Sequence, residues 1–208
     1  FRGLTAIPEN MGELENLTVL SLWGNELRSL PDSIGDCSNL SFVNLGENRL
    51  QSLPESIGNL TIKRALFLEN NRLEALPEDF GQCEVRAWLD LSGNQLSDLP
   101  ASMGYIKAWR AMFGSNRLSD IPSSIMYMQK VAQLDFSDNL LQELPFGLLE
   151  MESLRSIDVS GNKIETVPEA YLRRGRARRL SLTCRDNPLS APERERIKEA
   201  FPMAFKVW

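Results

Sequence analysis

The chain has 208 residues, of which 42% are hydrophobic and 25% are charged, and its formal net charge is −5. This acidic balance argues against binding to nucleic acid or to an anionic membrane, because both depend on positive potential. Histidine is absent, so the chain has neither a histidine general base nor a histidine metal ligand. No apolar run approaches the length that spans a membrane.

An internal repeat runs through the chain. Its most regular feature is an asparagine every 22 or 23 residues, at Asn25, Asn48, Asn71, Asn94, Asn116, Asn139 and Asn162. The pattern LxxLxLxxNxL recurs around these residues, and a proline follows six residues after each asparagine. Such a period predicts a solenoid of stacked units, since no single unit can bury its apolar edge alone.

Each unit is predicted to contain a short strand and a short helical turn. In the LxLxxN segment, apolar and polar residues alternate with the two-residue period of a strand that is buried on one face. The asparagine amide offers a donor and an acceptor to the backbone at the bend, so stacked asparagines would form a hydrogen-bond ladder. The LPxxIG segment that follows, for example residues 30–35, suits a turn into a short helix because proline fixes φ at its start.

The C-terminal end departs from the repeat. Leu180 and Leu182 are interpreted as an eighth, degenerate strand, with Arg185 at the position of the asparagine. Ser190 and Glu193 have the spacing of a capping box at the start of a helix. The predicted apolar stripe of this helix is formed by Ile197, Ala200 and Phe201. This stripe is expected to cover the open end of the solenoid.

These motifs resemble the leucine-rich-repeat superfamily, specifically the 23-residue, LPxxIG-containing intracellular type of Ras-pathway scaffolds and bacterial secreted effectors. The resemblance implies an α/β fold: a curved solenoid with parallel strands on its concave face and short helices or 3-10 turns on its convex face. Residues 185–201 are similar to the closing segment of bacterial effector repeats. We expect the solenoid over residues 1–189, beginning mid-repeat as in a fragment, and a capping helix with its tail over residues 190–208.

The cysteines bear on the compartment. Cys37, Cys83 and Cys184 lack the paired clusters that cap extracellular repeats, so we predict buried free thiols in a reducing environment. Three glycosylation sequons, at Asn16, Asn39 and Asn59, point the other way, but a three-residue motif recurs easily by chance. We therefore expect a cytoplasmic site of action, which for a bacterial effector would be the host cytoplasm.

Three positions in each unit face outwards from the predicted strand, at six, four and two residues before the asparagine. In the eighth unit this count gives Arg179, Ser181 and Thr183. Large apolar side chains gather on the first five units, and we predict a partner-binding site formed by Trp23, Phe42, Phe67, Trp88, Asp90, Trp109, Arg110 and Met112. An apolar patch beside polar ground is typical of a protein-binding surface. The alternative is that these rings pack only against one another or against a flanking segment.

Units three and four break the repeat. Lys63 and Arg86 stand eight residues before the asparagine, where the other units have an apolar core residue. Because a buried unpaired cation is costly, we expect the backbone to shift by one residue and to turn Ile62 and Val85 inward. The predicted basic edge consists of Lys63, Arg64, Arg86 and Lys107, continued by Arg110, Lys130, Arg155, Arg178 and Arg179. The alternative is a solvated rim that binds nothing.

Catalysis is not expected. Asp90, Asp135 and Asp158 fall on the strand face, but no matched base or nucleophile accompanies them, and the cysteines are not spaced for zinc. We expect no enzyme, no cofactor and no metal, but a monomeric protein-interaction module that binds a protein partner through the concave face. The resemblance favours the substrate-recruiting domain of a bacterial effector, with a Ras-pathway type of scaffold as the alternative. Binding of an anionic ligand or nucleic acid through the basic edge ranks third.

Overall fold

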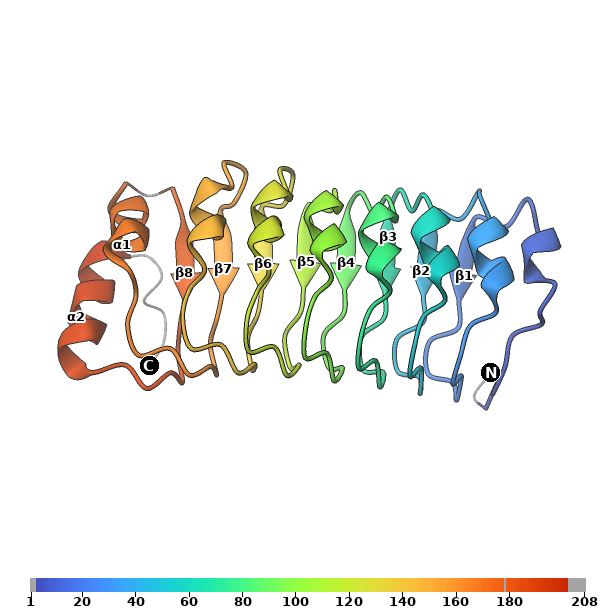
Figure 1. Ribbon diagram of the computed structural model, residues 1–208, viewed down its shortest axis with the longest axis horizontal. Helices are drawn as coiled ribbons and strands as arrows, with labels where there is room; N and C mark the ends of the chain where they lie inside the picture. Colours follow the sequence, from blue (N-terminus) through green and yellow to red (C-terminus); the bar gives the residue numbers. More distant parts are fainter. Residues whose placement is uncertain (1–2, 178, 202–208) are drawn as a thin grey trace.

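Parallel strands, one from each unit, build the sheet on which the molecule is organised. The computed structural model describes residues 3–177 and 179–201, and within them eight strands pair in chain order from β1 to β8. Their bounds are β1 (Val19–Ser21), β2 (Phe42–Asn44), β3 (Ala65–Phe67), β4 (Trp88–Asp90), β5 (Arg110–Met112), β6 (Gln133–Asp135), β7 (Ser156–Asp158) and β8 (Ser181–Thr183). Figure 1 shows them side by side along an elongated solenoid, which confirms the predicted fold.

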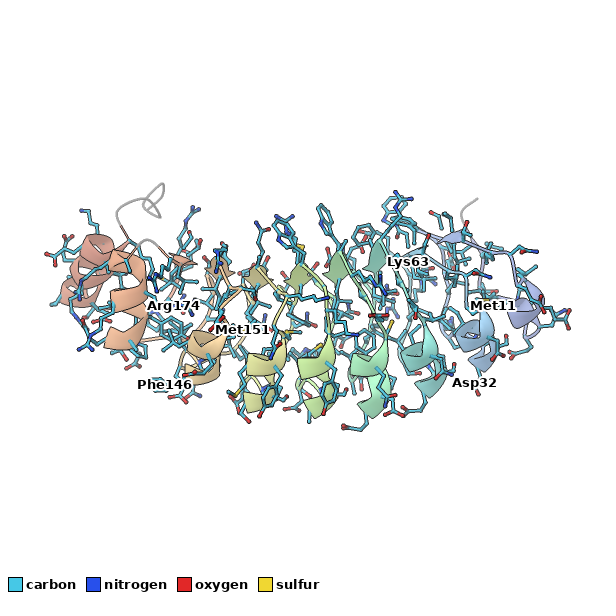
Figure 2. The ribbon with its side chains drawn as sticks, turned by 90° about the horizontal axis from the view of Figure 1, so that it is seen from above. Met11, Asp32, Lys63, Phe146, Met151 and Arg174 are labelled. Atoms are coloured by element: carbon cyan, nitrogen blue, oxygen red, sulfur yellow. The ribbon has the colours of Figure 1, made fainter. Side chains whose placement is uncertain are left out.

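The opposite face of the solenoid is covered by short helices. Seven are 3-10 helices: η1 (Met11–Glu13), η2 (Asp32–Asp36), η3 (Glu55–Asn59), η4 (Glu78–Gln82), η5 (Ala101–Tyr105), η6 (Ser123–Tyr127) and η7 (Phe146–Glu150). Two α-helices follow, α1 (Glu169–Arg176) and α2 (Ala191–Ala200). A proline stands directly before each helix from η2 to α1, as the LPxxIG motif predicts. Figure 2 shows Asp32 and Phe146 on the helical side and Lys63 over the strand side.

The asparagine ladder forms as predicted. The Nδ2 group of Asn94, for example, donates to the carbonyls of Leu68 at 3.0 Å and Leu91 at 3.0 Å, while its Oδ1 accepts from the Leu73 amide at 3.0 Å. Each asparagine therefore ties its own bend to the preceding unit. Since these groups are buried, the ladder satisfies backbone polar atoms that water cannot reach.

The prediction for the eighth unit is wrong in register. Asn187, rather than residue 185, is the eighth buried asparagine, and it donates to the carbonyl of Val159 and accepts from the amide of Ile164. Ser156 consequently pairs with Ser181, so β8 is displaced by two residues from the predicted count. The two additional residues are accommodated because this unit has the eight-residue helix α1 where the others have a 3-10 helix. Of the two leucines predicted for this strand, Leu182 lies in β8, whereas Leu180 stands directly before it; both are buried.

The irregular third and fourth units behave as expected. Ile62 and Val85 are buried, whereas Lys63 and Arg86 are exposed. In the fifth unit Ala108 takes the inward position and leaves Trp109 exposed. The one-residue shift therefore keeps the core apolar and turns the long cationic side chains towards solvent.

The C-terminal cap differs from the prediction in one contact. The Ser190 hydroxyl accepts a hydrogen bond from the amide of Glu193 at 3.3 Å, as an N-cap does. The Glu193 carboxylate, however, accepts from the amide of Val167 at 2.8 Å, so it joins α2 to the preceding unit rather than completing a capping box. Ile197, Ala200 and Phe201 are buried as predicted. Residues 202–208 of the predicted tail lie outside the described residues.

The three cysteines are buried and form no disulfide. Burial raises the pKa of the Cys83 thiol to about 12 and that of Cys184 to about 11. Both thiols therefore remain protonated at neutral pH and pack as small apolar groups in the core.

Candidate partner-binding face

Three aromatic rings form a continuous row across the concave sheet. Phe42, Ala65 and Trp88 lie side by side on neighbouring strands, and the small side chain of Ala65 leaves room for Phe67 to fill the space between the outer two rings. The Phe67 ring meets Phe42 edge to face at 5.7 Å and Trp88 at 6.0 Å between centroids. Such T-shaped contacts fix the rings in place, and we call Phe42, Phe67 and Trp88 the ring row.

An arginine lies over each end of the ring row. The guanidinium of Arg64 is 5.4 Å from the centroid of Phe42, and that of Arg110 is 4.9 Å from Trp88 and 5.8 Å from Trp109. The Nε group of Arg110 also donates to the side-chain oxygen of Gln133. None of the ion pairs among the described residues includes either arginine. Both cations are thus positioned by rings and remain available to an acidic group.

The predicted basic edge is only partly basic. Glu84 bridges Lys107 at 2.8 Å and Arg86 at 3.2 Å, and these two hydrogen bonds lower the pKa of its carboxyl group. Sequence reasoning missed this carboxylate because Glu84 and Lys107 belong to different units. Of the four residues predicted for this edge, Lys63 and Arg64 have no carboxylate partner among the described residues. Arg178 lies outside them.

The aspartates on this face shape the backbone. Asp90 accepts hydrogen bonds from both the amide and the hydroxyl of Ser92, and Asp135 and Asp158 accept from the amides two residues further on at 2.8 and 2.9 Å. These contacts are Asx turns that bend the chain at the strand end. Asp90, which the sequence predicted as a partner contact, therefore has a structural role at that bend.

The remaining predicted contacts divide between two locations. Met112 is half-buried on β5, beside the ring row. Trp23 is 49% exposed and lies at the strand-exit edge in a cleft with Gly24, Glu47 and Arg49. The ring contacts that join the ring row do not include Trp23. The structure therefore brings together Phe42, Phe67, Trp88, Trp109 and Arg110, and leaves Trp23 apart.

Sequence reasoning missed Glu69. This half-buried carboxylate lies against Gly46 of the preceding unit, where a Cβ atom would come within 2.1 Å of Glu69 Oε1. Its Oε2 atom is buried, and no described group donates a hydrogen bond to it. Burial, with the nearby charges of Asp90 and Glu47, raises the pKa of its carboxyl group. The sequence signal that could have identified Glu69 is the pair of Gly46 and Glu69 at the same repeat position in consecutive units.

Two kinds of feature are absent from the described part of the chain. Residues 3–177 and 179–201 contain no group of three or more cysteine, aspartate and glutamate side chains arranged to hold a metal ion. Helices long and apolar enough to cross a bilayer are likewise absent from these residues.

The architecture defines a repeat-protein solenoid with an open sheet, and comparisons with known proteins specify the class. The family model described as leucine rich repeat matches residues 15–73, and no curated protein matches significantly in sequence. The leucine-rich-repeat protein LIC12759 of Leptospira interrogans is similar over 96% of the chain, with 29% identity and a TM-score of 0.82. A plant peptide hormone receptor, RGFR1 in complex with RGF2, is similar over 93%, with 30% identity and a TM-score of 0.76.

The chain therefore has the leucine-rich-repeat fold, and residues 15–73 match the family in sequence. It spans 51% of the Leptospira chain and 32% of the plant receptor chain. Leucine-rich repeats are typically protein-interaction modules, and an open sheet of parallel strands, as found here, provides the extended surface that such modules use.

Proposed function

We propose that the concave sheet binds a protein partner, with the ring row and its two arginines as the centre of the interface. The observation that carries this proposal is the stacking of Arg64 and Arg110 over rings that are themselves fixed by edge-to-face contacts. Tryptophan and arginine are the residues most enriched at the energetic centres of protein interfaces. Because the side chains are held before binding, little conformational entropy is lost on association.

The ring–ring contacts do not account for the whole apolar surface. Trp88 remains 42% exposed and Trp109 47% exposed, although Trp88 contacts Phe67 and both indoles lie under Arg110. An exposed aromatic surface of this kind, surrounded by polar side chains, supports binding more than internal packing. The plant receptor that resembles this chain was solved in complex with RGF2, so a related solenoid is found with a ligand.

For the biological setting, we propose the substrate-recruiting domain of a bacterial effector that acts in host cytoplasm. The support is the likeness of residues 185–201 to the closing segment of effector repeats and the structural similarity to a bacterial leucine-rich-repeat protein. Buried cysteines without disulfides suit a reducing compartment. An intracellular scaffold of the 23-residue, LPxxIG type is the alternative, and the domains encoded beside this segment in the full-length gene discriminate the two.

The binding proposal is tested by affinity purification with mass spectrometry from eukaryotic cell lysate. The wild-type chain is compared with the double variant Trp88→Ala, Arg110→Glu and with Tyr105→Ala, which removes an exposed ring from the helical side. We expect a partner that wild type and Tyr105→Ala retain and the double variant loses. Trp88→Ala alone should weaken the purified complex by about 2 kcal/mol or more, roughly thirtyfold. Equal capture by all three folded proteins would contradict the assignment of the site.

A further inference from the structure

Charge is segregated across the concave sheet. The strand-entry side of the ring row has three cations without a carboxylate partner among the described residues, namely Lys63, Arg64 and Arg110. The strand-exit side has the outward-facing carboxylates Glu69, Asp90, Asp135 and Asp158. A partner that covers the ring row meets opposite charges on its two sides.

Charged groups without a partner of opposite charge lie on both sides of the ring row. On the strand-entry side, the guanidinium groups of Arg64 and Arg110 lie over Phe42 and Trp88 and bind no acid. On the strand-exit side, the Oε2 atom of Glu69 is buried and has no hydrogen-bond donor among the described residues. A buried carboxylate oxygen without a donor is unfavourable, and the positive charge of a partner side chain placed beside Glu69 would stabilise its ionised carboxylate.

The spacing of these groups matches an α-helix. The two guanidinium groups lie over rings on β2 and β4, two strands apart, which is about 10 Å at the usual strand separation. Seven residues of an α-helix rise about 10.5 Å and return to the same face. Trp88 and Glu69 belong to different units, and their positions within the repeat are four residues apart along the strand direction. Four extended residues span about 13 Å, close to the 10–12 Å diameter of a helix.

We propose that the partner segment is an amphipathic α-helix that lies along the solenoid over β2 to β5. Two acidic side chains seven residues apart bind Arg64 and Arg110, an apolar stripe covers Phe67 and Trp88, and a basic side chain reaches Glu69. This mode is the helix-in-groove form of recognition. The opposite charges also fix the direction of the helix, because the reversed helix would bring its acidic flank against Glu69. This inference rests on the proposed function and specifies its partner.

The experiment uses a displayed library of random 18-residue peptides selected on the whole chain. We expect enriched peptides with apolar residues at helical spacing, acidic residues seven apart, and helix formation on binding seen by circular dichroism. Arg110→Glu should weaken the selected peptides at least tenfold, and a matching Glu→Lys change in the peptide should restore binding. The matched control is Arg28→Glu, which reverses an exposed cation outside this face and should leave binding unchanged.

The possible failures are distinguishable. Peptides that lose binding with Trp88→Ala but not with Arg64→Glu or Arg110→Glu would overturn the helix proposal and leave the binding face intact. Enriched peptides that are rich in proline, or that stay extended when bound, would do the same. Absence of any peptide that depends on Trp88, Arg64 or Arg110 would overturn both this inference and the proposed function.

Discussion

The asparagine ladder permits a sharp test of how the solenoid is stabilised, through the substitution Asn94→Ala. The three carbonyls that accept from Asn94 each keep another donor: Leu68 O accepts from Asn71, Leu91 O from Asn116, and Ser92 O from the Asn70 amide. The Leu73 amide loses its acceptor on Asn94 and has no other acceptor among the described residues. One orphaned buried amide costs about 1–3 kcal/mol, which is the destabilisation we expect.

The same change at the first asparagine is a matched control. Asn25 Oδ1 accepts from the amide of Leu4, a residue that is 43% exposed, so water can replace the lost acceptor. Asn25→Ala should therefore cost less than about 1 kcal/mol. Urea denaturation followed by circular dichroism, with the slope checked for cooperative unfolding, measures both variants. Equal losses of stability at the two positions would refute this account of the ladder.

Three further predictions follow from glycine, carboxylate and thiol environments. Gly81→Ala should lower the unfolding free energy by about 1–3 kcal/mol or more, because the new Cβ would lie 1.7 Å from the Ser102 carbonyl oxygen. Gly147→Ala is the control, since its Cβ would lie 3.4 Å from the nearest atom, and thermal melts should show little change in its stability. The folded-state pKa of Glu69 is raised, so protonation of this carboxyl group favours folding at acid pH, and that contribution is lost as pH rises through the folded-state pKa. Glu69→Gln should therefore be more stable than wild type at pH 7 but not at pH 4. A difference in stability that does not change with pH would contradict this reasoning. Cys83, with its pKa raised to about 12, should resist iodoacetamide at pH 8 until the protein is unfolded, and rapid native labelling detected by mass spectrometry would show that it is accessible.

The binding face combines features that the sequence predicted separately. The strand period placed Phe42, Phe67 and Trp88 outward, and the structure adds that the small side chain of Ala65 allows their rings to touch. The sequence also indicated a concentration of cations near these residues. It could not show that Glu84 pairs with two of those cations while Arg64 and Arg110 stack on rings.

The sequence by itself determined the solenoid, the asparagine ladder and the inward positions of Ile62 and Val85. These features follow from local spacing, because a strand alternates its side chains and a buried cation is costly. Only the tertiary structure decided the register of β8, the role of Asp90 in a turn and the unpaired Glu69 oxygen. Each of these depends on contacts that the repeat pattern does not specify. The length of the helix sets the register of the next strand, and a flexible side chain can reach more than one neighbouring group.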